Sequence, residues 1–167
     1  MRLIIASLLV FSVVILFLFA LFPSEISVSR VIQINKPGPE VQKKIADLRE
    51  WKSWNDFLYP AGVQDGKPEV SGKTDSIKIS RSDVTVDLLS VAQDTILTRW
   101  RRGDKSFVGS FYLTELNGQT IVDWTMHFHI SWYPWEKLAS MFYEKQLGPQ
   151  LEKSLLKLRN ELEKPAR

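Results

Sequence analysis

The sequence predicts an α+β domain behind an apolar N-terminal helix, and three observations lead to this prediction. An uncharged run of twenty residues, Leu3–Phe22, precedes the remainder of the chain. Five stretches with strand patterns then follow one another between residues 76 and 132, separated by short turn sequences, which is typical of an antiparallel sheet. A leucine-rich segment of helical periodicity ends the chain.

The uncharged run is long enough to cross a lipid bilayer. At about 1.5 Å per residue, its twenty residues cover roughly the 30 Å hydrocarbon core. A cleavable signal peptide is the alternative, but the run is longer than the apolar region of such peptides, and the stretch FALFPSE has no small-x-small cleavage site. We therefore expect residues 1–23 to form an uncleaved single-pass transmembrane anchor and residues 24–167 to form one domain.

The side of the membrane on which the domain lies is left open, because basic residues flank the run at both ends. The expectation that we carry forward is an inside N-terminus and an exported domain, periplasmic or extracellular. The chain has no cysteine, which excludes disulfides and thiolate metal sites, and its net charge of +3 gives little support to nucleic-acid binding. The oligomeric state is not determined by the sequence.

The segment after the anchor predicts a first strand and then two short helical stretches. Residues 26–34 place apolar side chains on one face, interrupted by Arg30, before the turn-forming sequence NKPGPE. Apolar residues recur at helical spacing within residues 40–49, and Trp51 and Trp54 follow three residues apart. This is the first half of the predicted domain.

A long loop and then five strands follow. Turn-forming residues interrupt residues 55–76, so we expect a functional loop or a lid there, with one short strand near residues 69–71. The strand-forming stretches are IKIS, VTVDLLSV, TILTRWR, SFVGSFYLTEL and TIVDWTMHFHISW, joined by RSD, AQD, RGDK and NGQ. Together with the first strand they give an antiparallel sheet of six or seven strands.

The C-terminal segment predicts one long helix over Pro134–Glu163, with a proline in its first turn. A buried stripe is formed by Leu151, Leu155, Leu158 and Leu162. Gly148 and Pro149 lie in the middle of this helix. Because a proline inside a helix removes a backbone hydrogen bond, we expect an interruption and a kink at that point.

This order of elements resembles the SRPBCC superfamily, which includes the START domains, the polyketide cyclase and dehydratase-like proteins and the birch pollen allergen group. The resemblance rests on SVSRVIQINKPGPEVQKKIADLREWKSWNDF and on DWTMHFHISWYPWEKLASMFYEKQLGPQLEKSLLKLRNELE, and it covers nearly everything after the anchor. It implies the helix-grip fold, a curved sheet around the long C-terminal helix with an apolar cavity between them. Members bind lipids, sterols, polyketides or other hydrophobic molecules, and some catalyse reactions on them. The glycine-rich stretch and following tryptophan of the cyclase-like members are missing from the central loop.

One bulky row of side chains could line such a cavity. Trp124, Met126, Phe128 and Ile130 share a face of the last strand, and exposing them would cost on the order of several kcal/mol at about 25 cal/mol per Å². A solid core and a ligand-accepting cavity both explain this row. The residues that we expect to line the cavity or its rim are Trp100, Phe107, Phe111, Trp124, Met126, Phe128, Ile130, Trp132, Trp135, Met141 and Gly148.

Three further motifs have both a structural and a functional interpretation. His127 and His129 could hold a metal, but the sequence places no third ligand beside them. They also lie on the face opposite the bulky row, so we expect them to belong to a polar outer face. The basic stretch RWRRGDK at residues 99–105 is expected to be a solvated hairpin tip, with contact to anionic lipid head groups as the alternative. WYPWEK at residues 132–137 either covers the edge of the core or forms a rim that admits a hydrophobic guest.

The chain has no cysteine nucleophile, no GxSxG, no HExxH and no phosphate-binding glycine loop. The favoured hypothesis is a membrane-anchored domain that binds a hydrophobic or amphipathic, lipid-like small molecule between the sheet and the C-terminal helix, without a cofactor or metal. One alternative is a polyketide cyclase-like or hydrolase-like enzyme, for which Asp87 and Asp123 are the strand acids to consider. The other is a non-catalytic structural or assembly module.

Overall fold

A six-stranded antiparallel sheet forms the body of the structure, in the order β1-β6-β5-β4-β3-β2. The structure is a computed structural model that describes residues 2–20, 24–59, 76–79, 83–131 and 133–164. The strands are β1 (Glu25–Ile34), β2 (Ser76–Ile79), β3 (Val84–Val91), β4 (Thr95–Arg102), β5 (Lys105–Leu116) and β6 (Gln119–His129). The predicted antiparallel sheet is confirmed, and the short strand predicted near residues 69–71 lies outside the described residues.

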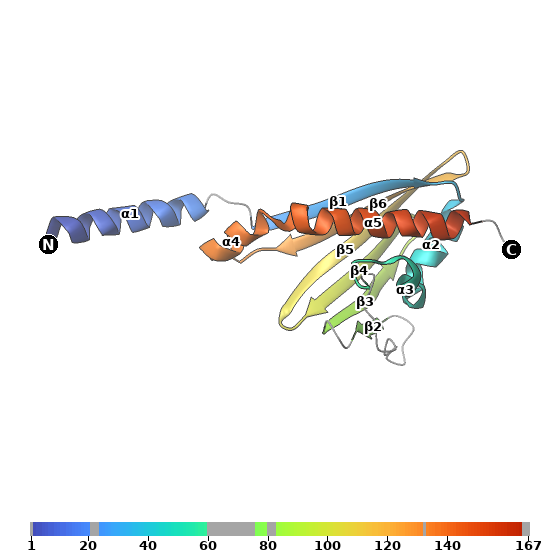
Figure 1. Cartoon of the computed structure of the whole chain (residues 1–167), viewed down its shortest axis with the longest axis horizontal. Helices are drawn as coiled ribbons and strands as arrows, with labels where there is room; N and C mark the ends of the chain where they lie inside the picture. Colours follow the sequence, from blue (N-terminus) through green and yellow to red (C-terminus); the bar gives the residue numbers. More distant parts are fainter. Residues whose placement is uncertain (1, 21–23, 60–75, 80–82, 132, 165–167) are drawn as a thin grey trace.

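Helices cover one face of this sheet. They are α2 (Gly38–Ala46), the 3-10 turn η1 (Leu48–Glu50), α3 (Trp51–Trp54) and α5 (Tyr143–Glu163), whereas α4 (Pro134–Ser140) lies at the end of the sheet next to α1 (Figure 1). The long helix α5 runs along the sheet and packs chiefly against β1, while α3 packs against α5 (Figure 1). This arrangement, a long C-terminal helix held against an antiparallel sheet, is the helix-grip architecture expected from the sequence.

The C-terminal helical segment is interrupted, but not at the predicted place. α4 ends at Ser140 and α5 begins at Tyr143, with a two-residue turn between them. α5 then continues through Pro149 as one helix, so the interruption predicted at Gly148–Pro149 is wrong. The reason is that Pro149 removes a single backbone donor, whereas the leucine stripe that follows it is buried against the sheet and holds the helix in place.

The apolar N-terminal run forms α1 (Arg2–Ala20), which extends away from the sheet at the end where α4 lies (Figure 1). Its described side chains are largely exposed: Leu3 is 86% and Phe17 is 65% exposed. In the part of the chain that the structure describes, no helix combines the length and hydropathy needed to span a membrane.

Candidate ligand cavity

Aromatic side chains fill the centre of the covered face of the sheet. Five fully buried rings form this packed centre: Trp51, Trp54, Trp100, Phe111 and Trp124. The ring centroids of Phe111 and Trp124 are 4.9 Å apart and those of Trp51 and Trp100 are 5.6 Å apart, which are normal distances for packed aromatic pairs. The two tryptophans of α3 therefore occupy the space that an open cavity would need.

Four of the predicted ligand-lining residues are buried in the hydrophobic core, three of them as rings of this packed centre. Trp100, Phe111, Trp124 and Met126 each have 0% of their surface exposed. Gly109 of β5 faces the same centre, and a Cβ added there would be 2.9 Å from the indole nitrogen of Trp100. The Trp100 indole thus fills the space that a side chain at position 109 would take. The middle of the sheet is therefore a solid core.

A cavity of about 270 Å³ lies beside this centre, at the end of the domain where α4 meets α5. Its apolar wall is formed by Phe57, Val84, Phe107, Phe128, Ile130 and Leu147, and its polar groups come from Arg102, Lys105, Ser106, His129, Glu136, Tyr143 and Gln146. Phe107 stacks on Trp100 at 5.8 Å and packs against Phe128 at 5.0 Å, so it separates the cavity from the packed centre. Three predicted lining residues, Phe107, Phe128 and Ile130, are therefore found at the cavity.

The sheet itself opens at this end. Pairing between β5 and β6 stops at Val108 and His127, although β5 continues to pair with β4, and β6 with β1. A second, shallower hollow of about 410 Å³ lies at this separation and shares Phe107, Phe128 and His129 with the cavity. The separated strand ends therefore account for the space at this position, because side chains of paired strands would close it.

An ion pair stands at the mouth of the cavity and joins the β4–β5 hairpin to α4. Lys105 Nζ lies 3.2 Å from Glu136 Oε1, and the backbone N–H of Ser131 donates to Glu136 Oε2 at 3.3 Å. The hydrogen bond from Ser131 and the Lys105 ammonium lower the pKa of Glu136, and Glu136 in turn raises the pKa of Lys105. Both groups are therefore charged at neutral pH.

Gly148 has a role that differs from the predicted one. Arg30 is the charged residue on the covered face of β1, and its guanidinium passes beneath α5 to reach Glu144, with Nη2 2.7 Å from Oε1. A Cβ added at Gly148 would lie 2.0 Å from Arg30 Nη2. The glycine therefore makes room for the arginine, and it does not line the cavity.

Two predicted rim residues lie outside the cavity. Trp135 is 65% and Met141 is 60% exposed, and neither lines it. Trp132 lies outside the described residues. Of the predicted lining residues that the structure describes, three therefore lie at the cavity, five are packed elsewhere and two are exposed.

The two histidines lie on the exposed face, as the alternation predicted. His127 Nε2 is 3.4 Å from Ser110 Oγ, and His129 lines both hollows. Within the described ranges, no three His, Cys, Asp or Glu side chains are grouped as metal ligands would be. The basic hairpin around Gly103 is also exposed.

Phe57 is positioned by a polar clamp between the segment after α3 and α5. Asp56, whose side chain is 4% exposed, accepts a hydrogen bond from Lys157 and forms an ion pair with Lys153, whose Nζ lies 2.8 Å from Asp56 Oδ2. The backbone N–H of Phe57 donates to Ser154 Oγ at 3.2 Å. Burial by itself would raise the pKa of Asp56, but the close contacts and positive charges of the two lysines outweigh it and lower the pKa.

Sequence reasoning missed several cavity residues. Phe57 was assigned to a loop, where no periodic pattern indicates burial. Tyr143 and Leu147 precede Leu151 at four-residue spacing, so extending the leucine stripe two turns toward the N-terminus would have found them. Lys105, which pairs with Glu136, lies 31 residues away, and no sequence pattern indicates that the two residues are close.

Comparison with known proteins agrees with this architecture. A family model described as polyketide cyclase / dehydrase and lipid transport matches residues 25–163. No curated protein matches the chain in sequence. Many solved structures have a similar fold at low sequence identity, and three of them are a START superfamily protein, a norcoclaurine synthase and DynU16.

A START superfamily protein from Mycobacterium smegmatis has a TM-score of 0.59 at 14% identity, over 82% of this chain and 97% of that chain. Truncated norcoclaurine synthase from Thalictrum flavum has a TM-score of 0.61 at 7% identity, over 85% and 96%. DynU16, a protein of the dynemicin biosynthetic locus, has a TM-score of 0.55 at 17% identity, over 83% of this chain and 47% of that chain. The present chain thus spans about half the length of DynU16, and at these identities the likeness shows the shared fold.

Proposed function

The chain belongs to the family of polyketide cyclases, dehydrases and lipid transport proteins, and we propose that it binds one hydrophobic or amphipathic, lipid-like molecule in the cavity at the α4–α5 junction. One observation supports this proposal: the wall of the cavity is apolar. Phe107 closes the cavity on one side, and the Lys105–Glu136 ion pair borders it on the other. Such a wall with a few polar groups at its edge is typical of small-molecule sites.

The size of the cavity limits the ligand. Its volume of about 270 Å³ is just below the usual range of about 300–1,000 Å³ for small-molecule pockets. The packed aromatic centre prevents a ligand from extending along the sheet. We therefore propose that a small apolar molecule, or the apolar end of a longer amphipathic one, enters the cavity while polar groups stay near Lys105, Glu136 and Gln146.

Binding without covalent chemistry is the function that the charges at the cavity favour. Glu136 has a lowered pKa, so at neutral pH it pairs with a cation and does not carry a proton to donate. The two strand acids are engaged elsewhere: Asp87 lies 2.8 Å from Arg101, and Asp123 accepts a hydrogen bond from Thr125 Oγ1 at 3.0 Å. An enzyme of the cyclase type would need an acid or base in the cavity with its pKa shifted toward neutrality.

A non-catalytic assembly module is the second candidate, and the filled aromatic centre is the observation that favours it. In that case the fold would serve as a scaffold, and the small cavity would be a packing remnant. The two candidates differ in whether an apolar molecule is retained or bound at the α4–α5 junction.

The second part of the proposal concerns the N-terminus. We propose that α1 holds the chain at a membrane, with the domain on the exported side. The uncharged run Leu3–Phe22, most of which lies in α1, and the exposed apolar side chains of this helix support the proposal, because an isolated apolar helix is unfavourable in water.

A cavity-filling variant tests the binding proposal. In Leu147→Trp the larger ring should occupy the cavity and abolish retention of apolar molecules, as measured by native mass spectrometry with lipid extraction and by displacement of an environment-sensitive dye. Leu156→Trp is the matched control, because Leu156 lies on the same helix, is 38% exposed and does not line the cavity. Equal dye binding in both variants, or none in the unmodified chain, would favour the scaffold.

A further inference from the structure

We propose that α4 and the turn after it form a membrane-contacting face, which lies in the interfacial layer of the bilayer and presents the cavity mouth to lipid. This α4 face is defined by Trp135, Leu138, Met141 and Phe142. The inference rests on the proposed membrane association of α1 and adds a second, separate contact between the domain and the lipid.

The α4 face is the first observation. Its four side chains are 65%, 49%, 60% and 56% exposed, and they lie within eight consecutive residues. Trp135, Leu138 and Met141 are spaced three residues apart, so they share one side of the helical segment. Contiguous exposed apolar groups of this kind mark a site of association on a soluble domain.

The polarity of α4 is the second observation, because it is reversed relative to a helix that faces water. The side of α4 that faces the domain carries Lys137 and Ser140, which are 4% and 5% exposed, and Glu136, which pairs with Lys105. The outward side carries the apolar groups. A helix with polar groups toward the protein and large apolar groups outward is suited to an apolar exterior.

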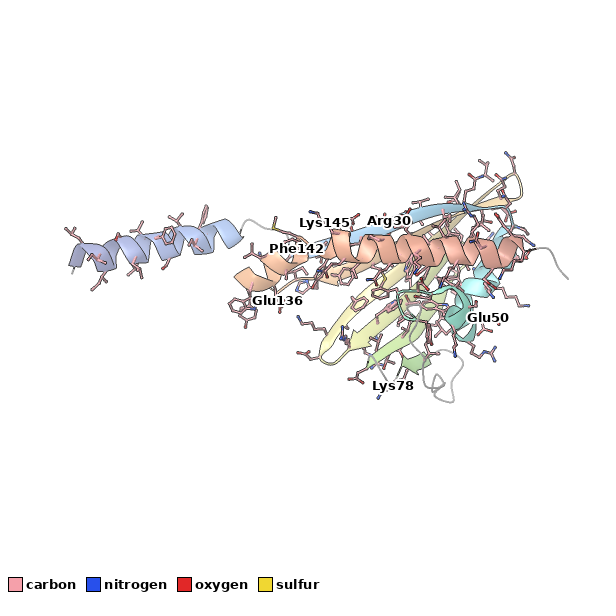
Figure 2. The ribbon with its side chains drawn as sticks, viewed as in Figure 1. Arg30, Glu50, Lys78, Glu136, Phe142 and Lys145 are labelled. Carbon is pink, nitrogen blue, oxygen red and sulfur yellow. The ribbon has the colours of Figure 1, made fainter. Side chains whose placement is uncertain are left out.

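Three features identify the covering partner as a lipid bilayer. α4 contacts α1, so the α4 face continues the exposed apolar surface of the N-terminal helix. Figure 2 shows Glu136 and Phe142 at the end of the domain that is nearest to α1. In addition, the Tyr133 and Trp135 rings stack at 4.9 Å, and such amphipathic aromatic groups are enriched at membrane–water interfaces.

The third feature is charge. Arg102 and Lys105 are exposed on the hairpin that the Lys105–Glu136 pair connects to α4, so they lie at the same end of the domain. Basic groups beside an inserted apolar face add attraction to anionic head groups. Because Glu136 and Tyr143 line the cavity and flank the α4 face, an apolar molecule could pass from the bilayer to the cavity without crossing water.

The experiment uses the absence of cysteine from the chain. Met141→Cys in the full-length chain is labelled with an environment-sensitive fluorophore and reconstituted into phosphatidylcholine vesicles, with and without phosphatidylglycerol, that contain lipids with doxyl quenchers. Leu116→Cys is the matched control, because Leu116 is 62% exposed and ends β5 at the opposite end of the domain from α4. Flotation of the vesicles measures membrane association independently of the label.

The expected result is a blue shift and loss of emission at position 141 that depends on doxyl lipid, with neither effect at position 116. The double variant Trp135→Ser, Leu138→Ser should reduce the quenching at 141 while the protein still floats with the vesicles and keeps its near-ultraviolet circular dichroism. If the protein floats but label 141 stays in water, the α4 face proposal is wrong and the anchoring proposal survives. If label 141 is shielded without doxyl quenching, a second copy covers the face and the bilayer proposal is again wrong. If the chain does not float, both proposals fail.

Discussion

Replacing Asp56 with asparagine should destabilise the domain in a way that depends on pH. The Asp56 carboxylate is 4% exposed and joins the segment after α3 to Lys153 and Lys157 of α5. Asparagine keeps the shape of the side chain but removes its charge. A hydrogen bond to a charged group contributes about 1.5–3 kcal/mol.

The magnitude follows from the exposure of the partners. The two lysine side chains are 59% and 40% exposed, so they regain water when the carboxylate is removed, and the loss is smaller than for a fully buried pair. We therefore expect the free energy of unfolding to fall by about 2 kcal/mol at pH 7, which corresponds to a decrease in Tm of about 5 °C for a domain of this size.

The sign of the pH dependence follows from the lowered pKa of Asp56. A carboxylate whose pKa is lower in the folded than in the unfolded chain stabilises the fold fully above the unfolded pKa of about 3.9. That stabilisation is lost as the pH falls through the folded pKa. The difference between Asp56→Asn and the unmodified chain should therefore be constant from neutral pH down to about 5 and decrease below about 4.

Urea unfolding in a neutral detergent, followed by tryptophan fluorescence, measures this difference. Asp47→Asn is the control, because Asp47 also has a lowered pKa, caused first by its hydrogen bond from Arg49, but this pair is local and more exposed. Its removal should cost at most about 1 kcal/mol. Equal losses in both variants, or a loss at Asp56 that persists unchanged in acid, would refute the reasoning.

Two further variants test contacts described above. Gly148→Ala should displace the Arg30 guanidinium and break its exposed ion pair, which costs about 1 kcal/mol. The higher helix propensity of alanine offsets this loss to a similar extent, so the free energy of unfolding in urea should change by less than about 1 kcal/mol. A loss above about 3 kcal/mol would mean that the arginine cannot move. Glu136→Gln should return the pKa of Lys105 toward its ordinary value, which NMR titration measures. It should also speed the uptake of an apolar dye, by no more than about fivefold. An unchanged pKa of Lys105 would show that the ion pair does not form in solution.

The sheet and its covering helix could be predicted because they depend on local alternation. In β6 the residues from Val122 to Phe128 alternate between covered and outer faces, and the structure places them accordingly. The interruption of the C-terminal helix was misplaced because Pro149 is a strong local signal, whereas the actual break at residues 141–142 has no glycine or proline to mark it.

The position of the cavity could not be predicted, because alternation tells which face is covered but not what covers it. Strand alternation places three aromatic residues on the covered face in the same way: Trp100, Phe107 and Phe111. Yet Trp100 and Phe111 are in the packed centre, whereas Phe107 borders the cavity. The difference is made by Trp51 and Trp54, which come from a separate segment and reach only the middle of the sheet.

The clamp and the cavity are physically connected through this same segment. No residue of α2 or α3 lines the cavity, but Phe57, which directly follows Asp56, forms part of its apolar wall and is held by Ser154. Loosening the clamp should therefore move a cavity wall as well as destabilise the fold. For this reason we expect Asp56→Asn to weaken the binding of an apolar dye at pH 7, while Asp47→Asn, whose contacts do not reach the cavity, should leave it unchanged.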